Sequence, residues 1–440
     1  MSQSAASSAR PYPAQRAPGQ PAPAPPALGK AKKGFWPAPT GKPVGTGVEN
    51  TPALLNRLQV IGIAAVLLFG LASGLVQLFS YQSDGRAADD TEQLLRVQGI
   101  QSSLLRADAL ATNAFLEGGD GDPDKRAEYD ETLASAFEEI AAAAEAQPAD
   151  REALSRLVVV VNQYANYVAE ARVYNRQGYP VGAEYLSVAS ESLRTDAQPI
   201  LGNLITANTE RAEDSMTGQH PFWLLLIGVL AAGVLVWLSV MLAQRFRRYV
   251  NAGIAVAMVI VVVTTVVASI AAWRGANQND GLLDSELQMA IDQAAARTAG
   301  NDAKAYESLR LIKRGSKATN EPKWEAAAEI VVDKADASAL SEWNNYAEGH
   351  AQIASFDDED LWFKARDAAI SNAPDGPTAN FNAFDDVTKE LAAESGATTT
   401  EDLRAGRTLA LVGSLLTLIL GFVASVAVAR GMNARRKEYA

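Results

Sequence analysis

Four long uncharged segments constrain the fold of this chain more than any other feature of its sequence. None of them contains Asp, Glu, Lys or Arg, and each is 22 to 24 residues long. Because a helix needs roughly 20 apolar residues to cross a bilayer core, each segment predicts a transmembrane helix. The predicted spans are residues 58–79, 222–243, 250–273 and 408–429. The first lies too far along the chain for a cleaved signal peptide, so we interpret it as a retained signal anchor.

The segments between the spans differ in the sign of their charge. Residues 1–57, 244–249 and 430–440 together carry a net charge of +12, whereas residues 81–220 and 274–407 carry −13 and −11. Since short basic segments remain in the cytoplasm, we expect both termini and the 244–249 loop to be cytoplasmic. The two acidic domains are then extracytoplasmic, in a multi-pass protein of the cell membrane whose first partner is the lipid bilayer. The acidic balance argues against a nucleic-acid partner.

The chain is organised as a tail followed by two similar halves. Residues 1–53 are rich in proline and predict a disordered cytoplasmic tail, either simply solvated with a membrane-proximal basic patch or used as a docking peptide. Each half contains a span, an acidic domain, and a second span, and residues 430–440 form a basic cytoplasmic tail. The similar lengths of domains 81–220 and 274–407 suggest an internal duplication. Tyr164-Ala165-Asn166-Tyr167 also resembles Trp343-Asn344-Asn345-Tyr346.

Both acidic domains are predicted to be helical bundles. Apolar residues recur at three-four spacing, which is the stripe of a helix packed in a bundle. Gly118–Pro123, Pro148 and Gly178–Pro180 divide the first domain into helices near 88–117, 124–147, 150–177 and 182–214. The second domain is divided at Gly315–Pro322, near residue 338, and at Asn372–Pro377. The predicted fold class is therefore all-α, with four transmembrane helices and two extracytoplasmic four-helix-bundle-like domains. The stripes are Val97, Ile100, Leu104, Ala107, Ala111 and Ala114; Leu154, Leu157, Val161, Tyr164, Val168 and Ala171; and Leu340, Trp343, Ala347 and Ala354.

The sequence offers no candidate catalytic residue and no cofactor motif, so we predict a protein that is not an enzyme. It has no cysteine, which excludes disulfides, thiolate nucleophiles and cysteine-ligated metals. Its two histidines, His220 and His350, are interpreted as structural groups, with a pH-sensing role as the alternative.

One acidic motif partly resembles a calcium-binding loop. Asp120, Asp122 and Asp124 alternate with other residues, and Glu131 stands where a calcium loop places its last ligand. Lys125 occupies the position that such a loop gives to glycine. A helix-starting acidic turn is the favoured interpretation, and no metal is predicted.

Two bundles on membrane helices resemble the sensory half of chemoreceptors and sensor kinases over residues 54–430. The chain also resembles the GlnX family of four-span actinobacterial membrane proteins, in its Pro-rich tail, span positions, two Cys-free helical domains and length. The resemblance implies that a solute-binding lipoprotein, GlnH, reports extracytoplasmic aspartate or glutamate and that a Ser/Thr kinase, PknG, receives the signal inside. Because the spans contain no ionisable group, a transporter pathway is not indicated. A cell-envelope scaffold and an accessory subunit of a transporter remain the alternatives, and a homo-oligomer is compatible with each.

Candidate partner-binding residues lie in two places. In an up-down-up-down bundle the first and third turns are farthest from the membrane, and loops often bind partners. The basic 244–249 loop either sets topology and contacts lipid headgroups or docks a cytoplasmic effector. The candidates are Gly119, Asp120, Tyr179, Pro322 and Pro374 in the turns, and Arg245, Arg247 and Arg248 in the loop.

Overall fold

The computed structural model describes residues 51–119, 122–246 and 251–438, and the fold of this part is all-α. Short π-helical turns join α4 to α5 and α7 to α8, at Leu193–Ala197 and Leu283–Leu287. The helices are α1 (Thr51–Glu117), α2 (Pro123–Ala146), α3 (Arg151–Arg176), α4 (Val181–Ser192), α5 (Gln198–Met216), α6 (Pro221–Phe246), α7 (Ala252–Leu282), α8 (Gln288–Ile312), α9 (Lys317–Lys334), α10 (Ala337–Asp358), α11 (Trp362–Ala369) and α12 (Pro377–Glu438).

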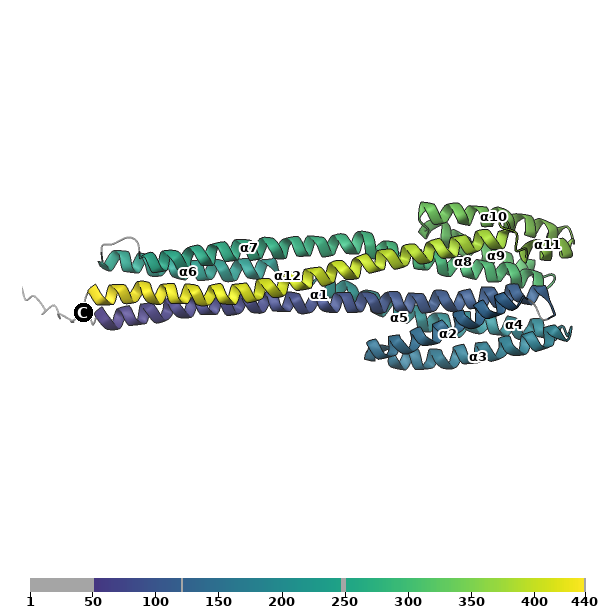
Figure 1. Cartoon of the computed structure of the whole chain (residues 1–440), viewed down its shortest axis with the longest axis horizontal. Coiled ribbons are helices and arrows are strands. Elements are labelled where there is room, and N and C mark those ends of the chain that lie inside the picture. The colour runs from purple at the N-terminus through teal and green to yellow at the C-terminus, as the bar shows by residue number, and fades with distance from the viewer. Residues whose placement is uncertain (1–50, 120–121, 247–250, 439–440) are drawn as a thin grey trace, which may run out of the picture. The chain divides into compact units, whose positions relative to one another are not determined.

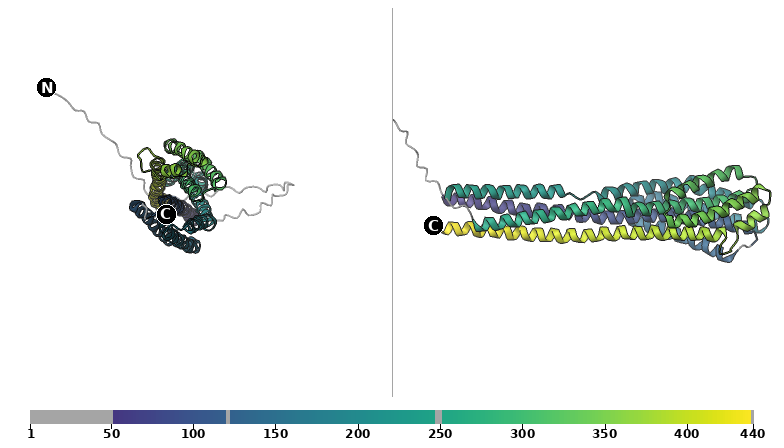
Figure 2. Two further views of the ribbon diagram at one scale, coloured as in Figure 1. Left: turned by 90° about the vertical axis from the view of Figure 1, so that its right-hand side faces the viewer. Right: turned by 90° about the horizontal axis from the view of Figure 1, so that it is seen from above.

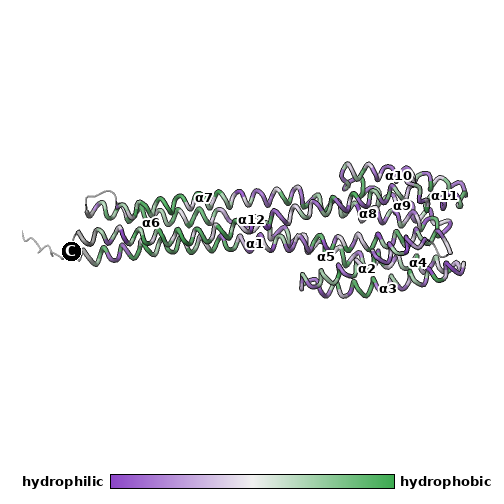
Figure 3. Tube along the Cα trace, viewed as in Figure 1, coloured by the Kyte–Doolittle hydropathy of each residue, from purple (hydrophilic) through white to green (hydrophobic). Residues whose placement is uncertain are grey.

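Four of these helices are long and apolar enough to cross a membrane, as the sequence predicts. They are α1, α6, α7 and α12, which run alongside one another over their apolar stretches (Figure 1, Figure 2). Figure 3 shows the hydrophobic colouring gathered on this part of the four helices. Their inner faces form one buried cluster, whereas side chains such as Leu68, Val259 and Ile419 are exposed on the outside. That pattern suits a helix bundle whose surface is covered by lipid tails. The chain is therefore a multi-pass membrane protein.

Small residues bring α1 and α12 close together within the spans. A Cβ atom added at Gly421 would lie 2.8 Å from the Cα atom of Gly70. Small residues permit such backbone approach between membrane helices, where packing replaces the hydrophobic driving force. Nearby, the Gln77 amide donates to the Thr417 hydroxyl at 2.9 Å, and the Ser414 hydroxyl donates to the Gly74 carbonyl at 2.9 Å.

The first bundle, defined as the part of α1 beyond its span together with α2, α3, α4 and α5, follows the predicted pattern. Glycines end α1 and α3 with left-handed backbone, at Gly118 (φ 74°) and Gly178 (φ 74°), a conformation that glycine adopts without steric cost. The predicted stripe of α3 is buried throughout, from Leu154 to Ala171. The predicted stripe of α1 is buried as well, except at Ala114, which is only partly buried.

The second bundle, defined as α8, α9, α10, α11 and the part of α12 before its span, has an aromatic core. Trp343 and Tyr346 of α10 pack against Phe384 and Phe381 of α12, with ring centres 5.2 Å apart in each pair. Two details differ from the sequence prediction. An additional short helix, α11, follows a turn at Glu359–Leu361, and Pro322 lies inside α9 rather than in the preceding turn. Gly315 (φ 86°) is sufficient to make that turn.

A polar cluster lies where the bundles meet the spans. The carboxylate of Asp84 is 2% exposed on α1 and accepts hydrogen bonds from Gln219, at 2.9 and 3.0 Å, and from Asn279 of α7, at 3.3 Å. Burial raises the pKa of Asp84, and these amide donors offset only part of that effect. The cluster joins α1, α7 and the segment between α5 and α6.

Candidate functional site

The turns predicted to bind a partner lie at the end of each bundle that is opposite the spans (Figure 1). Gly119 follows α1 with φ 60°, Tyr179 between α3 and α4 is 56% exposed, and Pro374 precedes α12. Pro322 belongs to α9 and is therefore not a turn residue. Arg245 falls in the last turn of α6, and Asp120, Arg247 and Arg248 lie outside the described residues.

The acidic turn after α1 starts a helix. The Asp122 carboxylate caps α2 by accepting a hydrogen bond from the Asp124 amide at 2.9 Å. This is the favoured interpretation of the acidic motif, because a capping carboxylate satisfies an unpaired amide and complements the helix dipole. Within the described residues, no group of three or more His, Asp or Glu side chains could hold a metal ion.

Two ion pairs connect the first helix of one bundle to the last helix of the other. Arg194, in the π turn after α4, lies 2.5 Å from Asp302 of α8 and also donates to Asp108 of α1 at 2.9 Å. On the other side, Asp385 of α12 lies 4.0 Å from Arg106 of α1. The first bundle supplies the arginine in both pairs. This arginine belongs to the last helix of that bundle in the pair with Asp302 and to its first helix in the pair with Asp385.

Within the second bundle, Asp385 is held firmly. The guanidinium of Arg297 donates to both of its carboxylate oxygens, at 2.9 and 3.0 Å, and the Asn301 amide donates at 2.7 Å. Burial by itself would raise the pKa of Asp385, but Arg297 and Arg106 outweigh this effect and hold the pKa below its usual value. The carboxylate therefore remains charged at the boundary between the bundles.

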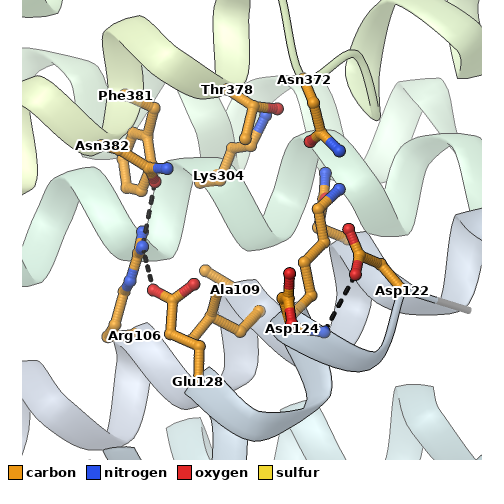
Figure 4. A pocket seen from close by; sticks show the side chains of 13 residues that line it. Arg106, Ala109, Asp122, Asp124, Glu128, Lys304, Asn372, Thr378, Phe381 and Asn382 are labelled. Atoms are coloured by element: carbon orange, nitrogen blue, oxygen red, sulfur yellow. Dashed lines mark hydrogen bonds and ion pairs between the residues drawn. The ribbon is translucent and has the colours of Figure 1, made fainter.

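A cavity of about 270 Å³ opens beside Arg106, between the first and second bundles (Figure 4). Arg106 donates to Glu128 of α2 at 2.5 Å and to Asn382 of α12 at 2.9 Å, and thereby closes one end. Asp124 and Asn372 reach toward the cavity from opposite walls. Its charged lining consists of three bases and three acids: Arg106, Lys125, Lys304, Asp122, Asp124 and Glu128.

A buried chain of charged groups extends from this cavity into the second bundle. The Lys304 ammonium donates to Glu307 at 2.6 Å, and Glu307 lies 2.9 Å from Nδ1 of His350. The other ring nitrogen of His350 lies 3.3 Å from Glu321, and Trp324 stacks on the ring with the centres 3.8 Å apart. His350 is thus buried and paired through both of its ring nitrogens.

The pairing shifts the pKa values of Glu307 and His350. Burial by itself would raise the pKa of Glu307, but Lys304 and then His350 outweigh it and hold that pKa at about 2. Burial opposes protonation of His350, but its bonds to Glu307 and Glu321 outweigh burial and raise the pKa of the ring. The electrostatic environment of Lys304 is therefore linked, through Glu307, to the protonation of a histidine whose pKa is raised.

The arrangement suits recognition more than bond-breaking chemistry. Positive and negative groups line one small cavity, so a bound solute with both charges finds partners for each. Sequence reasoning missed these residues, although one signal was available. Arg106 and Asp108 flank Ala107 of the apolar stripe of α1, and charged residues at such positions require partners when they are buried.

Comparison with known proteins supports a sensing role. The family model of the actinobacterial sensor domain matches residues 83–217, which are the first bundle. No curated protein and no solved structure matches the chain. The first bundle is therefore similar to a sensor domain, as expected for a membrane sensor of an actinobacterium.

Proposed function

We propose that this protein is a non-enzymatic transmembrane relay that reports the status of an extracytoplasmic solute to a cytoplasmic effector. The observation that supports this proposal most strongly is the continuity of α1 and α12. Each passes without a helix break from the interbundle cavity through an apolar span. Because a helix transmits sliding or rotation along its axis, a change in how the bundles meet reaches the other end of the spans.

The proposed solute is an amino acid. In the interbundle cavity, the Lys304 ammonium can bind an α-carboxylate, and Asp122 and Asp124 can bind an α-ammonium. A solute-binding lipoprotein is the proposed outer partner, docking at the turns that contain Gly119 and Tyr179. Inside, a Ser/Thr kinase is the proposed effector.

We also propose that the effector docks at the loop that follows α6, and that both termini are cytoplasmic. The basic charge of residues 244–249 supports both proposals. Single cysteines at Ser7 and Asp375 test the orientation, because the natural chain has none. An impermeant maleimide should label intact cells at residue 375 but not at residue 7, and the reverse pattern would overturn the topology.

An internal duplication is proposed for the two halves. Tyr164 of α3 and Trp343 of α10, which align in the similar motifs, are both buried in the cores of their bundles. The two cross-bundle ion pairs join equivalent helices, namely the first of one bundle and the last of the other. Both features are expected when one ancestral bundle pairs with its copy.

Spin labels at the cytoplasmic ends of the spans test the relay. Asn56 of α1 and Gln244 of α6 are exposed, and replacing both by cysteine allows their separation to be measured by double electron–electron resonance. A mixture of the proteinogenic amino acids, alone or with the lipoprotein, should shift the distance distribution. A scaffold would give the same distribution under every condition, and that result would refute the relay.

A matched pair of variants tests the role of the cavity. Asp124→Asn removes a charge that lines the cavity, whereas Asp130→Asn removes one on the same helix that pairs with Arg172 outside it. The spin-label response to amino acids should be lost in the first variant and retained in the second. Equal responses would show that the amino acid does not bind through Asp124.

A further inference from the structure

A second cavity, of about 250 Å³, lies between the bundles where α4 meets α8 and α9. Residues of both bundles line it, and none of them lines the cavity beside Arg106. It is smaller than the 300–1,000 Å³ typical of sites for drug-sized ligands, so it would accept only a small solute.

The lining of this second cavity is mainly cationic. Arg194, Lys313 and Lys323 face one acidic side chain, Glu191. The hydroxyl groups of Ser316 and Thr319 and the amide of Asn320 add polar groups at the start of α9. Two further acids, Asp108 and Asp302, pair with Arg194 but do not belong to the lining.

The cations retain capacity for another partner. Within the described part of the chain, Lys323 forms no salt bridge, and its ammonium lies 5.3 Å from the ring centre of Tyr306. The Nε atom of Arg194 is buried and has no hydrogen-bond partner among the described residues. Among the residues that the structure describes, Lys313 pairs only with Glu184, which is 64% exposed, so solvent weakens that pair.

We propose that this cavity is a binding site for a small dianion, either a dicarboxylate or a phosphate. Its charge complements the ammonium groups of Lys313 and Lys323 beside the guanidinium of Arg194, whose charge Asp108 and Asp302 already share. Partial removal from water strengthens each attraction. Such a ligand would touch α4 of the first bundle and α9 of the second at the same time. Its binding would therefore stabilise one arrangement of the two bundles, whether or not an amino acid occupies the cavity beside Arg106.

Calorimetric titration of the purified full-length chain with succinate and with inorganic phosphate tests this proposal. At least one dianion should bind saturably, and neutral succinamide should not bind. Lys323→Gln should weaken binding about tenfold or more, since a hydrogen bond to a charged group contributes about 1.5–3 kcal/mol. Lys317→Gln is the matched control, because Lys317 lies on the same helix, outside the cavity, and pairs with Asp358.

A second measurement needs no variant. The bound dianion should slow acetylation of Lys323 by an amine-reactive reagent and leave Lys317 unaffected. Binding of succinate alone identifies a carboxylate site and binding of phosphate alone identifies a phosphate site, and either supports the proposal. Absence of saturable binding by both, or binding and acetylation that do not involve Lys323, would overturn it.

Discussion

Replacement of Arg194 by methionine should destabilise the protein strongly. Arg194 is the only cation that the structure places against Asp108 within salt-bridge distance in the described residues. The Asp108 carboxylate is fully buried, and its other hydrogen bond comes from the neutral hydroxyl of Ser190 at 2.7 Å. Methionine fills much of the same volume but leaves the Asp108 carboxylate without an ion-pair partner, and it leaves Asp302 with the weaker attraction of Lys323.

The expected cost follows from burial. Removing one partner of a buried ion pair costs about 3–5 kcal/mol, mainly because the other charge remains in a poorly solvated position. Arg156 supplies the control, since it pairs with Glu152 one helical turn away and both side chains are more than two-thirds exposed. An exposed pair of this kind contributes only about 0.3–0.5 kcal/mol. The two arginine-to-methionine changes should therefore differ about tenfold in free energy.

Denaturant unfolding of the full-length chain in detergent, followed by circular dichroism, measures both variants. Arg194→Met should lower the midpoint far more than Arg156→Met. The comparison uses the same substitution in the same bundle, so a general effect of methionine cancels. If both variants lose the same small amount of stability, the buried ion pairs of Arg194 do not stabilise the fold.

Three further predictions concern titration and packing. Glu307 and Glu321 raise the pKa of His350, so protonated His350 stabilises the folded state. This contribution is complete below about pH 6.5, the pKa of an unfolded histidine, and it is lost as pH rises through the pKa of the folded state. His350→Gln should therefore flatten this part of the curve of melting temperature against pH, and an unchanged slope would contradict the assignment. Gly421→Val forces a side chain against Gly70 and should lower the free energy of unfolding by about 1–3 kcal/mol. Gly233→Val, in open space on α6, should lower it less. Equal losses in the two variants would count against close packing of α1 and α12. Burial raises the pKa of Asp84, so its charged form destabilises the fold at neutral pH. Asp84→Asn should therefore raise the melting temperature at neutral pH, and the difference from the natural chain should shrink as pH falls. A lower melting temperature at every pH would refute the argument.

Local features of the sequence were sufficient to predict the helices of the first bundle. The segment predicted at 150–177 is α3, Arg151–Arg176, and the segment predicted at 124–147 is α2, Pro123–Ala146. Glycine and proline act on the backbone beside them, so their positions identify the ends of helices without knowledge of the rest of the fold. Pro322 shows the limit of this reasoning. It lies in the second turn of α9, where it lacks the amide that would donate to the Ala318 carbonyl, and the helix nevertheless continues through it.

The site depends on contacts that local patterns do not contain. Arg106 and Asp385 are 279 positions apart, and nothing near either residue in the sequence identifies the other. The acidic run from Asp357 favours, by its sequence alone, a solvated face or a helix break, and α10 ends at Asp358. However, Arg310 of α8 donates to Asp357 at 2.9 Å and to Asp358 at 2.6 Å. Such pairs form only after the helices pack, so the register between helices has to be known first.

In both cross-bundle pairs the first bundle supplies the arginine and the second bundle supplies the aspartate, which bears on which bundles can meet. If two first bundles from different chains paired in the same geometry, Arg106 of one would face Arg194 of the other. Two second bundles would likewise place Asp302 opposite Asp385. Like charges at partly buried positions disfavour both arrangements, whereas a first bundle and a second bundle complement each other. The pairing in the structure is therefore the one that the charges select.

Introduced cysteines show whether this pairing occurs within one chain. The hydroxyl oxygens of Ser102 on α1 and Thr298 on α8 are 2.8 Å apart, and the natural chain contains no competing thiol. The double variant Ser102→Cys and Thr298→Cys should oxidise to an internal disulfide, so that the protein migrates as a monomer on a non-reducing gel. Each single variant is the control and should form no internal bond. A disulfide-linked dimer in the double variant alone would show instead that first and second bundles pair between chains, in which case the relay would be a property of the oligomer.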